Sequence, residues 1–153
     1  MKRVLIALDY GLSAQKIAEQ GFELAKSMNA KVTLLHVVAD ESYYNAIDSA
    51  AFVGFYGYDY FDTVDSDSLI NSSLSFLDNI KTHLKDPTIE TIAKQGDFAK
   101  VILETAENYN SSLIVLGSHS HNWLEKALMG SVTESVLAET KIPMYIIPVK
   151  GYQ

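Results

Sequence analysis

Residues 31 to 38 read Lys-Val-Thr-Leu-Leu-His-Val-Val, a run of β-branched and apolar side chains. Because apolar residues occupy both the odd and the even positions, both faces of the corresponding strand are expected to be buried. A strand that is covered by helices on two sides is typical of a parallel sheet in an α/β protein. The run therefore predicts one strand of such a sheet.

The segments on either side of this run alternate between strand and helix patterns. Val4 to Leu8 is a continuous apolar run, and an amphipathic helix is expected from about Leu12 to Asn29. The later expected elements are a helix with an apolar stripe at 69–84, a strand at 88–94, a helix at 97–109, a strand at 113–117, a helix at 131–139 and a strand at 144–149. This βαβαβαβαβ order predicts a three-layer α/β sandwich with a five-stranded parallel sheet, forming a single domain over 1–153.

The composition narrows the possible partners and locations. The chain has 153 residues, no cysteine, 12 basic and 19 acidic side chains, and a formal charge of -7. The lack of cysteine excludes a disulfide framework and a thiolate metal site, and it fits a reducing cytoplasm. Because the net charge is negative and the basic residues are scattered, nucleic acid is not an expected partner. No apolar run approaches the roughly 20 residues of a membrane span, so neither a membrane segment nor a signal peptide is expected.

Residues 39 to 65 have neither a helical nor a strand period. They form an insertion that contains half of the chain's 16 aromatic residues (9 Tyr, 6 Phe and 1 Trp). A structureless segment of this length is uncommon in a compact domain, and its aromatic content argues against disorder. Two interpretations remain open: a flap that packs on the sheet edge, or a lid or partner-binding surface.

A polar loop lies between the strand that ends at Gly117 and the helix that Gly130 and Ser131 open. The free backbone N–H groups of such a helix start could hold an anion. In open parallel sheets, ligands bind beyond the carboxyl ends of the strands, where the strand order reverses. If the strand at 113–117 is a neighbour of the first strand, Asp9 and Gly117 face each other at that point. A carboxylate and an anion-binding loop then share one cleft.

The polar residues have other interpretations. Ser131 and Glu134 have the spacing of a capping box, which would satisfy the donors of the helix itself. His119 and His121 have a spacing seen in metal sites, but no third ligand is evident, so a metal site is not expected. His36 lies in a buried strand and is expected to be a hydrogen-bonded core residue. P-loop, dinucleotide-binding and nucleophile-elbow motifs are absent from the sequence.

Two glycine motifs have a defined spacing: Gly117-Ser118-His119-Ser120 is followed by nine residues and then by Gly130-Ser131. Together with the segments at 4–9, 33–38 and 142–149 and with Gly96 before a helix, they resemble the universal stress protein family. That family's nucleotide-binding signature is G-x-x-G, nine residues, G-[ST]. Ser120 stands where the signature has its second glycine. Its Cβ restricts the backbone and takes up room near a phosphate, while its hydroxyl could donate to one.

The resemblance implies a strand order of 3-2-1-4-5 and a site for ATP, with Mg or Mn held chiefly through the phosphates. It also implies that Asp9 contacts the ribose, that Ala7 lines the base pocket and that the Val37 backbone hydrogen-bonds adenine. The other nucleotide-binding residues implied are those of the loop and the following helix start: Gly117, Ser118, Ser120, Gly130, Ser131 and Val132.

Two main hypotheses follow. The first is a cytoplasmic stress-response protein that binds ATP or a related adenine nucleotide as a regulatory ligand, with little or no turnover, because no general base or transition-state cation can be assigned. The second is a dimeric interaction module that binds no nucleotide and uses the aromatic insertion for an unknown protein partner or a small ligand. A slow ATPase with Lys126 as the phosphate cation is a third.

The strand from Met144 to Val149 is expected at the edge of the sheet, and an apolar edge is usually covered or paired. The resemblance implies that this strand pairs with its copy across a two-fold axis, so a homodimer is expected.

Overall fold

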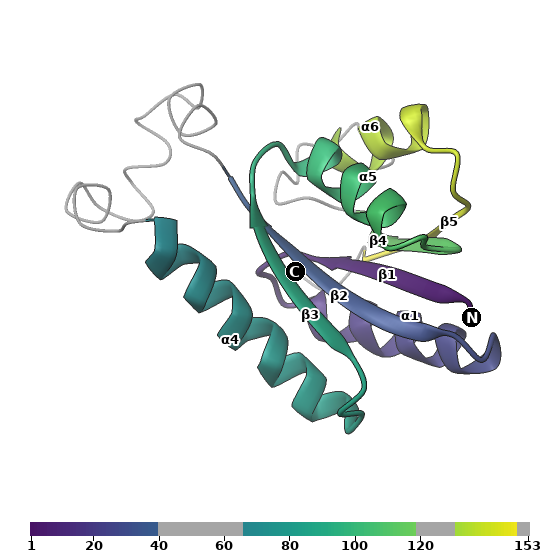
Figure 1. The fold of residues 1–153 in the computed structure, drawn as a ribbon, viewed down its shortest axis with the longest axis horizontal. Coiled ribbons are helices and arrows are strands. Elements are labelled where there is room, and N and C mark those ends of the chain that lie inside the picture. The colour runs from purple at the N-terminus through teal and green to yellow at the C-terminus, as the bar shows by residue number, and fades with distance from the viewer. Residues whose placement is uncertain (40–65, 119–130, 150–153) are drawn as a thin grey trace.

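The computed structural model describes residues 1–39, 66–118 and 131–149. Strands and helices alternate along these residues (Figure 1). The elements are β1 (Arg3–Leu8), α1 (Ala14–Ser27), β2 (Lys31–Val38), α4 (Ser66–Leu84), β3 (Glu90–Gln95), α5 (Phe98–Asn108), β4 (Leu113–Gly117), α6 (Ser131–Glu139) and β5 (Met144–Ile147). The predicted order of elements is confirmed, and the aromatic insertion lies outside the described residues except for Ala39.

Two strands are shorter than predicted, for local reasons. The predicted start of β3 at Thr88 is wrong, because Asp86 Oδ1 accepts hydrogen bonds from the Thr88 backbone N–H (2.8 Å) and hydroxyl (2.6 Å) and so holds a turn. The strand begins only at Glu90. The second strand, β5, ends at Ile147, because Pro148 has no N–H to donate to a neighbouring strand.

All five strands are parallel and follow the order β3-β2-β1-β4-β5. β1 is the central strand: Val4 lies opposite Val32 of β2 on one side and opposite Leu113 of β4 on the other. The predicted fold class and strand order are both confirmed.

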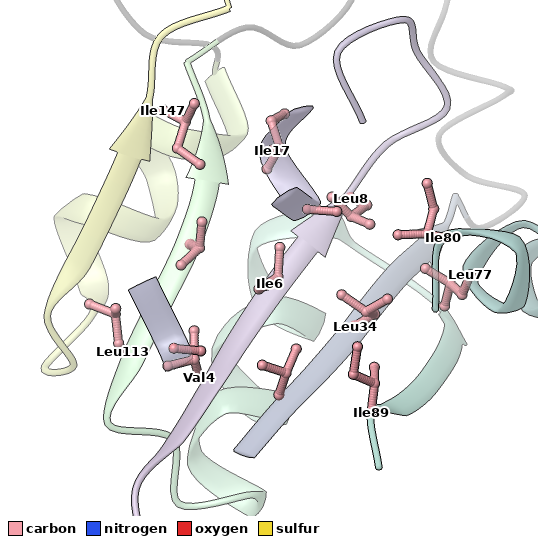
Figure 2. Close-up of a cluster of buried hydrophobic side chains, with 14 of the residues drawn as sticks. Val4, Ile6, Leu8, Ile17, Leu34, Leu77, Ile80, Ile89, Leu113 and Ile147 are labelled. Atoms are coloured by element: carbon pink, nitrogen blue, oxygen red, sulfur yellow. The ribbon is translucent and has the colours of Figure 1, made fainter. Parts of the chain in front are cut away.

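The sheet has a hydrophobic core on each face, because successive strand residues point to opposite sides. α1 and α4 cover one face, and α5 and α6 cover the other (Figure 1). The core under α1 and α4 includes Val4, Ile6, Leu8, Ile17, Leu34, Leu77, Ile80, Ile89, Leu113 and Ile147 (Figure 2). The core under α5 and α6 includes Leu5, Leu35, Val37, Val101, Ile102, Ala106, Ile114, Leu116 and Val136.

None of the helices in the described part of the chain is both long and apolar enough to cross a membrane.

Candidate functional site

β1 and β4 stop pairing with each other before either strand ends. Their last paired residues are Ile6 and Val115, whereas β1 continues to Leu8 and β4 to Gly117. On their other sides, toward β2 and β5, the pairing of both strands reaches Leu8 and Gly117 themselves. The strand order reverses between β1 and β4. The ends of β1 and β4 at the carboxyl edge of the sheet are therefore not paired with each other, at the point where open α/β sheets bind their ligands.

Four of the residues predicted for the nucleotide site lie at this edge. Asp9 directly follows β1 and is exposed, and Gly117 is the last residue of β4. Ala7 and Val37 point to the face that α5 and α6 cover, where Val37 is buried and Ala7 is half-buried. The prediction that the strand before Asp9 and the strand ending at Gly117 are neighbours in the sheet is confirmed. Their contacts with a nucleotide stay a prediction.

The first turn of α6 is attached to the end of β4. The hydroxyl of Thr133, which is buried, donates a hydrogen bond to the Gly117 carbonyl oxygen at 3.0 Å. α6 begins at Ser131, as predicted, and Val132 is half-buried against the core under this helix. Glu134 lies in the first turn and is exposed. The N-terminus of α6 is thus held close to the carboxyl edge. Thr133 is not among the site residues predicted from the sequence.

Ser118 connects the end of β4 to the end of β5 and the residues that follow it. Its backbone N–H donates to the Ile147 carbonyl at 2.9 Å, and its hydroxyl oxygen accepts a hydrogen bond from the Val149 N–H at 3.2 Å. Ser118 is 9% exposed. These contacts give the predicted ligand residue Ser118 a structural role in joining the end of β4 to the segment that follows β5.

The structure gives a packing reason for the glycine at 117. A Cβ at this position would lie 2.5 Å from Ile17 Cδ1 and 3.4 Å from Val149 Cγ1. A side chain at residue 117 would therefore displace the end of the Ile17 side chain of α1. This glycine thus has a packing role against α1, in addition to any role in ligand binding.

An aromatic and polar cluster surrounds the residue that follows Asp9. The Tyr10 ring lies 4.3 Å from the His36 ring and 4.8 Å from the Phe76 ring, measured between centroids. Ser73 of α4, fully buried, joins the cluster: its Oγ lies 2.8 Å from His36 Nδ1 and 3.3 Å from the Tyr10 hydroxyl. Tyr10 is not among the site residues predicted from the sequence, where its only signal is its place beside Asp9.

His36 is the hydrogen-bonded core histidine that the sequence predicts, with a side chain 5% exposed. Burial lowers the pKa of His36 below its ordinary value of 6.5, and the charge of the Asp9 carboxylate partly opposes this effect. The imidazole is therefore neutral at physiological pH, and one of its nitrogens is paired with Ser73.

Because the pKa of His36 is lowered, the free energy of unfolding is expected to fall in mild acid. The pKa of His36 in the folded chain is lowered below 6.5. As the pH falls through about 6.5, the unfolded chain therefore takes up a proton before the folded chain does. The free energy of unfolding that His36 contributes is complete above this pH and falls as the pH drops below it, by about 1.4 kcal/mol for each tenfold difference in proton affinity. Urea denaturation at about pH 7.5 and about pH 5.5 measures the loss. The same measurement on His36→Asn should show a clearly smaller loss, and equal losses would contradict the assignment.

No group of three or more His, Asp or Glu side chains that could hold a metal ion occurs in the described ranges 1–39, 66–118 and 131–149. The predicted site residues Ser120 and Gly130 lie outside these ranges, as do His119, His121 and Lys126.

Comparison with known proteins identifies the family. The family model of the universal stress proteins matches residues 1–148. The chain belongs to the universal stress protein family. It is 26% identical to Universal stress protein A of Escherichia coli (strain K12) over 152 residues, which cover 97% of this chain and 95% of the relative. The resemblance found in the sequence is therefore confirmed.

Solved structures of universal stress proteins share the fold. A universal stress protein in complex with cAMP matches with a TM-score of 0.66 and 17% identity, over 96% of both chains. The universal stress protein from Archaeoglobus fulgidus in complex with dAMP matches with a TM-score of 0.64 and 15% identity, over 96% of this chain and 98% of that one. At these identities the likeness establishes the common fold.

Proposed function

We propose that this universal stress protein binds ATP or a related adenine nucleotide as a regulatory ligand, at the carboxyl edge between β1 and β4. The observation that carries the proposal is that these two strands stop pairing with each other after Ile6 and Val115, before either strand ends. The position is the topological switch point of the sheet. Two structural relatives with the same fold are complexes with cAMP and dAMP, which supports an adenine nucleotide as the ligand class.

The described residues around this edge fit the parts of a nucleotide. Asp9 is exposed and carries a carboxylate, which suits the hydroxyls of a ribose. Ala7 has a small, half-buried apolar side chain, which suits a base, and the Val37 backbone would hydrogen-bond adenine. The start of α6, tied to Gly117 through Thr133, directs free backbone N–H groups toward the edge and suits phosphates.

The remaining residues of the proposed site are those of the loop and helix start: Ser118, Ser120, Gly130, Ser131 and Val132. A Mg or Mn ion would be held chiefly through the nucleotide phosphates, which commonly supply ligands to Mg. Backbone N–H groups, hydroxyls and one carboxylate bind and orient such a ligand. None of them is assigned to activate water, so we propose a regulatory ligand with little turnover.

The proposal extends to a homodimer through β5. β5 is an edge strand, and its Tyr145 side chain is 43% exposed. An exposed apolar edge strand is commonly covered by pairing with another chain.

The Asp9 carboxylate provides the direct test. Isothermal titration calorimetry with ATP and Mg is expected to give saturable binding to the wild-type protein. Asp9→Asn is expected to weaken this binding at least about 10-fold, because a charge-assisted hydrogen bond is worth about 1.5 to 3 kcal/mol and about 1.4 kcal/mol is tenfold in affinity. Glu107→Gln is the matched control: it removes the same charge from an exposed side chain in the last turn of α5, and it should bind as the wild type does.

The outcomes separate the two main hypotheses. If the wild-type protein shows no saturable binding at millimolar ATP, cAMP or AMP, the nucleotide proposal is wrong and the interaction module takes its place. Equal affinity of Asp9→Asn and the wild type would remove Asp9 from the site. Phosphate release measured in parallel, if it is lost in Asp9→Asn, would favour the ATPase.

A further inference from the structure

We propose that Tyr10 is a positioning residue, which fixes the Asp9 carboxylate by docking the turn between β1 and α1 onto α4 through Ser73 and Phe76. This inference rests on the proposed nucleotide site and adds a residue that does not itself touch the ligand. It makes the position of α4, a helix on the face away from α6, part of that site.

The turn that carries Asp9 leads into a helix start without a side-chain cap. Ser13, the N-cap of α1, makes no side-chain capping hydrogen bond, and Leu12 is 85% exposed. Within the turn, the backbone N–H of Ala14 donates to the Gly11 carbonyl at 3.1 Å. A side-chain cap typically adds about 1 kcal/mol to the stability of a helix start. This contribution is absent at the start of α1.

Tyr10 supplies contacts to two other elements. Its ring meets Phe76 of α4 at 4.8 Å with an interplanar angle of 57° and His36 of β2 at 4.3 Å with an angle of 50°. Tilted aromatic pairs at such distances are worth about 0.5 to 1.5 kcal/mol beyond their buried area. Tyr10 is nevertheless 45% exposed, so burial in a core does not explain its position. The ring is held by specific contacts, and the Asp9 backbone is held with it.

Ser73 links these contacts through one buried hydroxyl. Its Oγ is within hydrogen-bond distance of both His36 Nδ1 (2.8 Å) and the Tyr10 hydroxyl (3.3 Å). The His36 and Phe76 rings also meet, with centroids 5.7 Å apart. These contacts form one cluster that joins the ends of β1 and β2 to α4. Its members are Tyr10, His36, Ser73 and Phe76. The charge of the Asp9 carboxylate also raises the pKa of His36 and so partly opposes the effect of burial.

The experiment combines two readouts on the full-length protein. Calorimetry measures the affinity for ATP and Mg, and hydrogen exchange measures the protection of backbone amides at 9–14. Tyr10→Ala is expected to weaken ATP binding at least about 5-fold and to speed exchange at 9–14, while amides in the middle of β1 and α4 keep their protection. Ser73→Ala should show the same pattern with about a 2- to 5-fold weakening, and Tyr10→Phe, which keeps the ring, should lie closest to the wild type.

Ser111→Ala is the matched control for Ser73→Ala. Ser111 is also buried, at 8% exposed, but its hydroxyl has no hydrogen-bond partner among the described residues. It precedes β4 at the opposite, amino edge of the sheet. Removing this hydroxyl costs no hydrogen bond, so ATP affinity and exchange at 9–14 should stay at wild-type values.

A double-mutant cycle distinguishes positioning of Asp9 from a general structural role. If Tyr10 acts through Asp9, Tyr10→Ala should weaken ATP binding little further when Asp9 is already replaced by asparagine. Additive losses in Asp9→Asn/Tyr10→Ala would overturn the proposal, and so would unchanged affinity in Tyr10→Ala. If the wild-type protein binds no nucleotide, the function proposed above fails separately. Faster exchange at 9–14 in Tyr10→Ala would then still support the docking of the turn, and unchanged exchange would overturn it.

Discussion

Replacing Leu34 with alanine is expected to lower the free energy of unfolding by about 3 to 5 kcal/mol, as measured by urea denaturation. Leu34 lies in β2 next to the central strand and is completely buried. Its side chain belongs to the cluster between the sheet and the helices α1 and α4, together with Leu77 and Ile89 (Figure 2). Truncation removes the transfer free energy of the lost carbons. It also leaves a cavity, because strands on both sides and the helices above prevent the site from collapsing.

Leu12→Ala is the matched control for this change. Leu12 is 85% exposed, so the same truncation creates no cavity and should alter the free energy of unfolding by no more than about 0.5 kcal/mol. A loss below about 1 kcal/mol in Leu34→Ala would mean that the core under α4 is packed more loosely than the structure describes.

Gly21→Leu is expected to lower the free energy of unfolding by about 2 to 3 kcal/mol, because it overpacks the contact between α1 and the sheet. Even a Cβ at this position would lie 2.7 Å from Ile6 Cδ1 and 3.2 Å from Val115 Cγ1. Both neighbouring side chains are completely buried and have little room to move. The better helix propensity of leucine offsets only about 0.8 kcal/mol of this cost. Thermal and urea denaturation measure the difference.

Two further variants test the cause of that effect. Gln20→Leu places the same side chain at the adjacent, exposed position of α1, where it should change the stability by no more than about 0.5 kcal/mol. Gly21→Leu/Ile6→Ala removes the side chain that the new leucine meets. The double variant should lose less stability than the sum of the two single losses, and strict additivity would contradict a steric cause.

The sequence was sufficient for most of the fold because its signals are local. The run at 31–38, with apolar residues on both faces, predicted a strand covered by helices. The apolar stripe of each expected helix predicted a crossover between parallel strands. Each of the two errors in strand bounds comes from a single residue. Asp86 holds a turn that delays the start of β3, and Pro148 lacks the N–H donor that would continue β5. The strand order came from the family resemblance, and the structure confirms it.

The candidate site was only partly predictable. Asp9 and Gly117 each directly end a predicted strand, so their shared edge followed from the parallel order. The hydrogen bonds of Ser118 to the segment after β5 and of Thr133 to Gly117 could not be predicted, because they depend on how the last elements pack against β4. Ser118 therefore has a structural role that no spacing rule indicates.

By itself, the sequence determined the alternation of strands and helices, the burial of the central strands and the placement of Asp9 and Gly117 at strand ends. These properties depend on hydrophobic periodicity over a few residues at a time. Only the tertiary structure decided that Gly117 lies against Ile17, where β1 and β4 stop pairing, and that Tyr10 meets Ser73 across 63 positions of sequence. Such contacts depend on how closely α1 and α4 pack on the sheet, and this distance is set by all the side chains between them together.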